Sequence, residues 1–321
     1  MKAIAEMWDQ FWFKPTPVTT IAVLRIVHGF VVLLWASAIA PDVYTFFTKE
    51  GLIPKQAQSG FRWGILNWFP QKGVVLALIV LLFVAGFCEM IGFRAKLASL
   101  LVFVCLISFS RRDPWVFNAG DSLFRHMSLF LAASPAGAAL SFDRWRKNRK
   151  DFWNFALRSP WAQRMIQVQV SILYLFTVWA KARGERWIGG TAVSESLRAG
   201  DLTRLDLGYR LTESVLLANL LTYGTLVVEL SLAILIWNRK LRPVVITLGI
   251  ALHLFIEVTF GLGFFSTVII MSYISFVPEE TMAKFLLNIR GRLGRSRIPP
   301  FRRLGLAGDT VPSPGLEPAR P

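Results

Sequence analysis

Long apolar stretches with few polar interruptions recur along most of the chain. Stretches of about 20 apolar residues cross a bilayer as helices. The pattern therefore predicts an all-α protein, a polytopic transmembrane helical bundle of eight spanning helices. Seven is the alternative count, because the third and the eighth stretches are short. The predicted spans cover residues 19–40, 73–93, 97–109, 121–140, 161–181, 214–237, 243–261 and 264–277.

The segments outside these spans are more polar. Between the first two spans, Trp63, Trp68 and Phe69 predict an interfacial helix, since aromatic rings prefer the headgroup level. Residues 1–18 predict a cytoplasmic segment without the layout of a secretory signal. Residues 279–321 are basic and rich in Gly and Pro, which predicts a partly disordered cytoplasmic tail. Residues 19–278 then form the membrane domain.

Charge predicts the orientation of the bundle. The chain has 36 Lys and Arg against 20 Asp and Glu, a net charge of +16. Most of this excess falls on one end of an eight-span arrangement, led by the cluster at residues 144–150 and by both termini. The positive-inside rule places that end, with both termini, in the cytoplasm. The charges lie between spans, so we expect a lipid bilayer as the partner and no nucleic acid.

Ionisable side chains from three spans reach the opposite, outer end. The fifth span ends at Lys181, the fourth begins at Asp121, and the seventh carries His253 and Glu257 one helical turn apart. Charged groups at membrane depth face a cavity or one another, because a lone charge there is costly. We therefore expect a functional pocket in the outer leaflet. The candidate catalytic residues are Lys181, Asp121, Arg125, His126 and Glu257.

Each of these side chains also has a structural interpretation. Lysines at span ends commonly extend to the headgroups, and Asp121 is placed to cap a helix. Arg125 and Glu257 could form an ion pair between helices. His253 fits an interhelical hydrogen bond better than a metal site, and no metal is expected from three histidines and two cysteines.

A second polar group lies nearer the cytoplasmic end of the predicted spans. Its members are Arg25, Glu89 and Glu229, and we interpret them as a packing contact between helices or as a charge-neutralising set. The sequence has no P-loop, no dinucleotide fingerprint, no Gly-x-Ser-x-Gly elbow and no His-Glu-x-x-His. These patterns would indicate an ATPase, a Rossmann enzyme, a serine hydrolase or a zinc protease, and none of these classes is expected.

Two central blocks carry a resemblance to a known family. Residues 110–145 contain Asn-x-Gly-Asp at 118–121, then a small-residue break and a Ser-x-Asp. Residues 167–193 contain Gln, Tyr, Lys and then Trp-x-x-Gly-x-Ala. Both blocks resemble the HTTM family, bacterial membrane proteins similar to the vitamin K-dependent γ-glutamyl carboxylase. The resemblance covers about residues 19–278.

The resemblance implies a helical bundle in a bacterial inner membrane, with its active face outside the cytoplasm. In the carboxylase branch, a lysine of the second block deprotonates vitamin K hydroquinone. Carried over, Lys181 is the base, and a reduced, vitamin K-like quinone is the implied cofactor in carboxylase-like lyase or oxidase chemistry. The motif positions add candidate substrate-binding residues, which are Asn118, Gln169, Trp187 and His253.

The chain also departs from the carboxylase pattern. Asp121 stands close to the position of a carboxylase histidine, and the large luminal domain that binds propeptide and substrate has no counterpart. We therefore expect a lipophilic quinone or a small exported peptide as substrate rather than full γ-carboxylation, with room for a separate substrate-binding or redox partner. A non-catalytic maturation or immunity factor for a secreted peptide and a small-solute transporter stay open as alternatives.

Overall fold

The computed structural model describes residues 2–52, 63–200, 203–205 and 213–293. The chain forms two compact units, Met1–Ala283 and Lys284–Pro321. The described part of the smaller unit is the C-terminal portion of helix α16. The predicted division at residues 18 and 278 stays a prediction, and most of the predicted tail lies outside the described residues.

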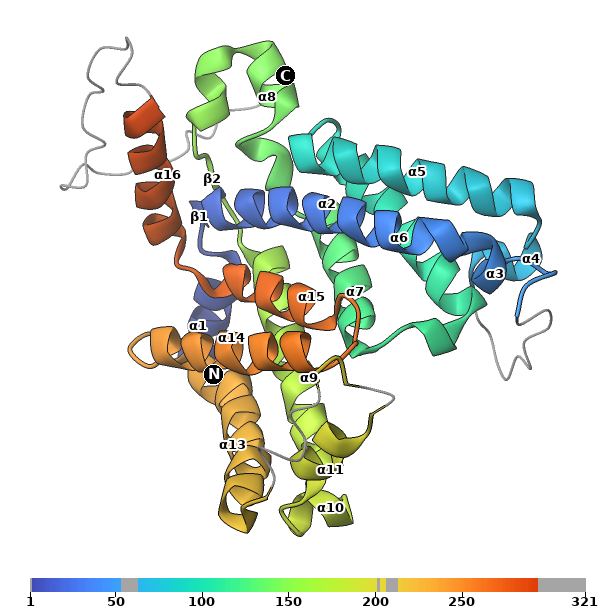
Figure 1. Ribbon diagram of the computed structural model, residues 1–321. Coiled ribbons are helices and arrows are strands. Elements are labelled where there is room, and N and C mark those ends of the chain that lie inside the picture. The colour runs from blue at the N-terminus through green and yellow to red at the C-terminus, as the bar shows by residue number, and fades with distance from the viewer. Residues whose placement is uncertain (1, 53–62, 201–202, 206–212, 294–321) are drawn as a thin grey trace, which may run out of the picture. The chain divides into compact units, whose positions relative to one another are not determined.

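The described chain is almost entirely helical (Figure 1). One two-stranded antiparallel sheet joins β1 to β2. The α-helices and strands are α1 (Lys2–Phe13), β1 (Thr16–Pro17), α2 (Thr19–Ile39), α3 (Val43–Phe47), α4 (Ile65–Trp68), α5 (Lys72–Ile91), α6 (Ala95–Arg112), α7 (Ala119–Ala133), α8 (Phe142–Lys147), β2 (Leu157–Arg158), α9 (Trp161–Lys181), α10 (Glu185–Ile188), α11 (Ala192–Arg198), α13 (Val215–Ile234), α14 (Arg242–Thr259), α15 (Phe265–Ser272) and α16 (Glu279–Leu293). Short 3₁₀ turns are η1 (Ala40–Asp42), η2 (Pro114–Val116), η3 (Ala136–Ala138), η4 (Arg149–Trp153), η5 (Leu235–Trp237) and η6 (Tyr273–Phe276).

Each predicted span contains a helix, but not all of these helices are long and apolar enough to cross a membrane unaided. Within the described residues, four meet that condition: Thr19–Phe47, Lys72–Ile91, Val215–Trp237 and Arg242–Thr259. The predicted count of eight or seven is therefore not confirmed. The fourth span was predicted too long, because α7 ends at Ala133, just before Ser134 and Pro135. Proline lacks the N–H group and blocks the helical backbone preceding it, which explains the early end.

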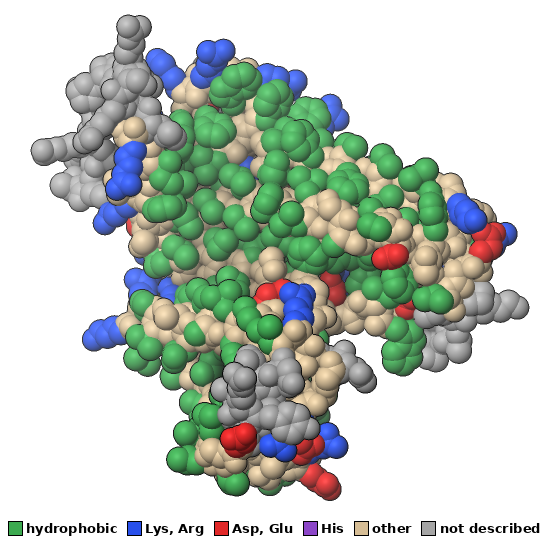
Figure 2. Space-filling model, in the orientation of Figure 1, with side chains coloured by type: hydrophobic (Ala, Val, Ile, Leu, Met, Phe, Trp, Pro, Cys, Tyr) green, Lys and Arg blue, Asp and Glu red, His purple; other side chains and the backbone are tan. Residues whose placement is uncertain are grey.

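Helices α2 and α5 lie side by side and pack closely (Figure 1). A Cβ atom at Gly29 of α2 would lie 2.5 Å from the backbone nitrogen of Met90, so only glycine permits this approach. Small residues let membrane helices bring their backbones together in this way. The outer faces of the same two helices expose Phe30, Val80 and Val84, and Figure 2 shows a broad apolar surface over them.

One end of the helical unit collects the loops that carry most of the positive charge. β1 pairs with β2, and Asp143 of α8 accepts a hydrogen bond from the backbone of Arg94, after α5. Arg242, at the start of α14, donates to the carbonyl of Phe276. Figure 2 shows basic side chains gathered over α8 and its neighbourhood. We name this the basic end.

The remaining loops meet at the opposite end. Asn118 Nδ2 donates to the carbonyl of Leu262 at 3.2 Å, and the backbone of Arg204 donates to Thr259 at 2.8 Å. Arg112, at the end of α6, donates to the carbonyls of Phe47 and Thr48. Loops therefore alternate between the two ends, as a chain that crosses back and forth requires. We name this second end the loop end.

The inner polar group is a closed network near the basic end. Arg25 is fully buried and donates to the carbonyls of Glu89, Met90, Ala136 and Leu140. The carboxylate of Glu89 accepts from Ser99 and contacts His28. The predicted association of Arg25 with Glu89 is confirmed, whereas the prediction that Glu229 joins them is wrong. Arg25 thus connects the end of α5 with the turn after α7, because it donates hydrogen bonds to carbonyl groups of both. This is a structural role.

Candidate functional site

Lys181 is paired inside the protein. Its Nζ donates to Oε1 of Glu229, which belongs to α13, and also lies 4.7 Å from the centre of the Trp187 ring. The side chain of Lys181 is 22% exposed, and that of Glu229 is 6% exposed. The sequence allowed two interpretations of Lys181, an anchor at the headgroups or an amine sheltered within the protein. The structure agrees with the second interpretation. A carboxylate beside the ammonium compensates a charge that would be costly alone at membrane depth.

The partner of Lys181 follows from the way α9 and α13 pack. Trp237 Nε1 donates to Ser171 Oγ at 2.8 Å, and Tyr223 donates to the carbonyl of Ile188 at 2.7 Å. These contacts make the two helices antiparallel, with Glu229 facing Lys181 between them. About 20 Å of helix separates the start of α13 from Glu229, at about 1.5 Å per residue. Lys181 therefore meets the second half of α13. A lysine at the outer interface would instead meet the first turns of that helix.

A second set of polar side chains lies on the same side of α9. The hydroxyl of Tyr174 hydrogen-bonds Nε2 of His253 at 2.8 Å and also the hydroxyl of Tyr273. All three side chains are buried, and they come from α9, α14 and η6. Gly249 makes room for this contact, because a Cβ atom there would lie 2.9 Å from the Tyr273 hydroxyl.

These two sets act on each other electrostatically. Tyr174 and Lys181 are two helical turns apart on α9 and share a face. The charge of Lys181 acts on His253, and the charge of Glu229 acts on both tyrosines. We name the Lys181 cluster by its five members, which are Lys181, Glu229, Tyr174, His253 and Tyr273.

Two atoms of the Lys181 cluster keep unused hydrogen-bonding capacity. Oε2 of Glu229 and Nδ1 of His253 are buried and have no hydrogen-bond partner among the described residues. A buried polar atom without a partner costs free energy, so native proteins usually supply a partner or use the atom. The cluster can therefore take a further hydrogen-bonding group, and a proton can be held by the amine–carboxylate pair or within the linked imidazole and hydroxyl groups.

Asp121 and Asn118 occupy a different place, at the loop end. Asn118 caps α7, and its side chain accepts from the backbone of Gly120 and Asp121. Asp121 accepts from the Asn118 backbone at 2.9 Å and from Trp35 Nε1 at 3.0 Å. The N-cap is therefore Asn118 rather than Asp121, which takes part as the N3 residue of the capping box. Both residues also line an open cavity of about 460 Å³, which we name the Asp121 cavity.

The other candidates from the sequence are dispersed. Arg125 donates to Ser110 at 2.6 Å, and Glu257 lies 4.0 Å from Arg204, so the alternative of an Arg125–Glu257 ion pair is wrong. Neither His126 nor Gln169 has a described contact with the Lys181 cluster. Gln167, two residues before Gln169, is the buried one, and it donates to the carbonyl of Ser275. The structure thus brings Trp187 into contact with Lys181 and places His253 in the neighbouring set, where the charge of Lys181 acts on it. The other candidates, which lie outside both sets, are Asp121, Arg125, His126, Glu257, Asn118 and Gln169.

Sequence reasoning missed three members of the Lys181 cluster. Tyr174 stood in the second block of the resemblance, seven residues before Lys181, and this spacing places both on one helix face. Glu229 was noticed but assigned to the wrong group. Tyr273 gave no signal, because a tyrosine inside an apolar stretch is an ordinary core residue.

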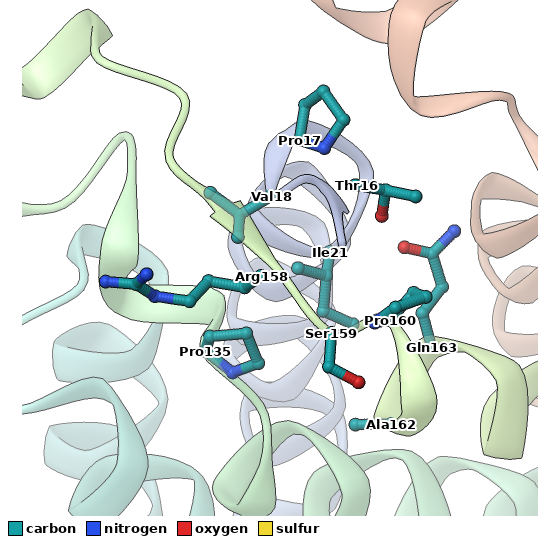
Figure 3. A pocket seen from close by; sticks show the side chains of 10 residues that line it. All are labelled: Thr16, Pro17, Val18, Ile21, Pro135, Arg158, Ser159, Pro160, Ala162 and Gln163. Carbon is teal, nitrogen blue, oxygen red and sulfur yellow. The ribbon is translucent and has the colours of Figure 1, made fainter. Parts of the chain in front are cut away.

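Another cavity is too small to hold a substrate. The cavity between β1 and the start of α9, lined in part by Thr16, Pro135 and Gln163, has a volume of about 10 Å³ (Figure 3). That volume holds about one water molecule. Within the described residues, no three His, Cys, Asp or Glu side chains are grouped to hold a metal ion.

Comparison with known proteins identifies a family. The sequence model of the HTTM domain matches residues 13–280. That range contains both the Lys181 cluster and the Asp121 cavity. Searches among curated proteins and among solved structures found no match.

Proposed function

The chain belongs to the HTTM domain family, and on that premise we propose that it is a membrane enzyme whose Lys181 cluster transfers protons to and from a lipophilic substrate. Its apolar helices and the family match make it a membrane protein. The proposed setting is a bacterial inner membrane, with both termini in the cytoplasm. The alternation of loops between the basic end and the loop end supports this topology.

One observation carries the proposal. Lys181 is paired with a buried carboxylate and lies beside a linked Tyr174–His253–Tyr273 set, although these groups come from separate segments. A lysine that only anchors a helix end needs no such surroundings. Titratable groups that converge at membrane depth typically mark a proton relay or a substrate site. Lys181 in its neutral amine form is the base in this proposal, and Glu229 stabilises the ammonium that forms when the amine takes the substrate's proton.

A reduced quinone fits the residues present. Nδ1 of His253 and Oε2 of Glu229 have no hydrogen-bond partner among the described residues, so they are available to its hydroxyl groups. The rings of Trp187 and Phe265 lie next to the cluster. Such a molecule would supply an acidic hydroxyl proton and reducing equivalents. A small exported peptide is the other proposed substrate class. The remaining predicted catalytic residues, Asp121, Arg125, His126 and Glu257, keep that role only as a prediction.

The test is turnover of a reduced menaquinone with oxygen in proteoliposomes. We expect Lys181→Ala and Lys181→Arg to lose at least about 100-fold in rate, the range of general base catalysis, because arginine stays protonated. Lys72→Arg is the matched control, since Lys72 also pairs with a glutamate, Glu50, but on the surface. It should keep the wild-type rate.

A non-catalytic maturation or immunity factor is the second candidate function. The ion pair of Lys181 with Glu229 favours it, because an arginine would preserve such a pair. If Lys181→Arg turns over like the wild type while Lys181→Ala is unstable, the pair is structural and the base assignment is wrong. A transporter gains less support, since Arg25 and Glu89 of the inner polar group are engaged by neighbours rather than facing a path.

A further inference from the structure

The Asp121 cavity is a second site whose chemistry differs from that of the Lys181 cluster. It lies where α2, η1, η2, the start of α7 and the turn at residues 261–264 meet. Aromatic rings form much of its wall, including those of Trp35, Phe46, Phe117 and Phe264. Among the described residues, its ionisable lining residues are Asp42 and Asp121, and no described lysine or arginine lines it. A mostly apolar cavity with a few converging polar groups is the usual form of a ligand site.

The two carboxylates are held in different ways. Asp121 is fixed by hydrogen bonds from Trp35 and from the Asn118 backbone. Asp42 is exposed at the rim, and no ion pair is described for it. Arg125, one turn beyond Asp121 on α7, acts on it electrostatically but donates its hydrogen bond to Ser110. The described wall of the cavity therefore presents negative charge and no positive side chain.

The aromatic wall strengthens the preference for a cation. The rings of Trp35 and Phe117 stack at 5.9 Å with an interplanar angle of 18°. Trp115 at the mouth is 88% exposed. Tryptophan side chains at the ends of membrane helices sit at the headgroup level, where amphipathic molecules reside. The mouth of the cavity thus opens where such molecules can reach it.

We propose that the Asp121 cavity binds the ammonium group of an amphipathic molecule, with Asp42 and Asp121 as counter-charges. Aromatic faces attract ammonium groups. The carboxylates also attract a cation, whereas they repel an anionic ligand. The apolar body of the ligand packs against Phe46 and Phe264. This inference does not rest on the Lys181 cluster, because it uses neither Lys181 nor a quinone.

Two sources can supply this ammonium group, an exported peptide with a free amino terminus and a phospholipid with an ammonium headgroup. Fluorine NMR of protein labelled with 5-fluorotryptophan separates them, with the Trp35 and Trp115 signals assigned by Trp→Phe substitution. The first probes are 2-phenylethylammonium and its neutral analogue 2-phenylethanol. The second pair is Phe-Leu amide and its N-acetylated form, and the third compares nanodiscs of phosphatidylethanolamine with nanodiscs of phosphatidylglycerol.

We expect 2-phenylethylammonium to shift the Trp35 and Trp115 signals, and 2-phenylethanol to leave them in place. Asp42→Asn should weaken binding about threefold, as an exposed charge pair does, and Asp121→Asn about tenfold. Glu50→Gln is the matched control, because Glu50 is an exposed carboxylate beyond the cavity and pairs with Lys72. Its affinity should equal that of the wild type.

Shifts with Phe-Leu amide only, or with phosphatidylethanolamine only, support the proposal and identify the source. The proposal is overturned if the alcohol shifts both signals as much as the ammonium does. It is equally overturned if no ammonium probe shifts them, or if both Asp42→Asn and Asp121→Asn bind with wild-type affinity. Since Asp42 is exposed, its variant keeps the test valid even where Asp121→Asn fails to fold.

Discussion

Lys181 and Glu229 were considered separately in the sequence analysis, but in the structure they are in contact. Their contributions to stability are therefore coupled. Each is a charge that the other compensates, and both are largely withdrawn from solvent. Removing one partner of a buried pair leaves an uncompensated charge, whereas replacing both by apolar groups of similar size often costs little. The stability of the pair can therefore be measured apart from any activity.

Glu229→Leu should lower the free energy of unfolding by about 3–5 kcal/mol, because it leaves the Lys181 ammonium without its partner. The double variant Lys181→Met with Glu229→Leu should recover most of that loss. Chemical unfolding in detergent micelles measures both. The corresponding double variant of the exposed pair, Lys72→Met with Glu50→Leu, should change stability by at most about 1 kcal/mol. A neutral Glu229→Leu would contradict the burial of the pair.

At the scale of helices, glycine decides how closely α2 and α5 pack. Gly29 faces the backbone of α5, which cannot move aside as a flexible side chain could. Gly224 of α13 has open space instead. Apart from the adjacent backbone of its own helix, no atom of the described residues lies within 4 Å of a Cβ atom placed there. The two positions separate the packing effect of a glycine from its effect on helix propensity.

Gly29→Ala should destabilise the protein by about 1–3 kcal/mol, since the new methyl group forces α2 away from α5. Gly224→Ala should instead stabilise it by about 0.5–1 kcal/mol, because alanine loses less backbone entropy in a helix. Thermal unfolding of both variants in the same nanodiscs gives the comparison. Equal effects of the two substitutions would mean that α2 and α5 are not in close contact.

At the scale of the whole molecule, the two ends predict two sides of a membrane. Lys147 of α8 lies at the basic end, and Glu185 of α10 lies in the loop that follows α9. In a chain with Cys88 and Cys105 replaced by serine, Glu185→Cys should react with an impermeant maleimide in intact spheroplasts. Lys147→Cys should react only after lysis. Reaction of both from the same side would refute the alternating topology, and the reverse pattern would invert it.

Hydrophobic periodicity predicted the helices well because each span is a local property of the chain. The end of α7 was harder to place, since Pro135 stops a helix inside a stretch that is still apolar. The Lys181 cluster depends on which helices are neighbours, and spacing along one helix reveals only its own face. Lys181 and His253 were therefore identified singly, whereas Glu229 was paired with the wrong partners and Tyr273 was not found.

The two carboxylates of the Asp121 cavity could not be associated from the sequence, because Asp42 and Asp121 come together only in the tertiary fold.

The register of α9 against α13 has a consequence for the supply of protons. α9 stops at Lys181, and α10 and α11 cover the first half of α13 in its place. That stretch carries the exposed charges of Arg183, Glu185 and Arg186, which must be hydrated. We expect the water around these charged groups to extend to the Lys181 side chain, which is 22% exposed, so that a proton can reach the amine without crossing the apolar interior of the bilayer.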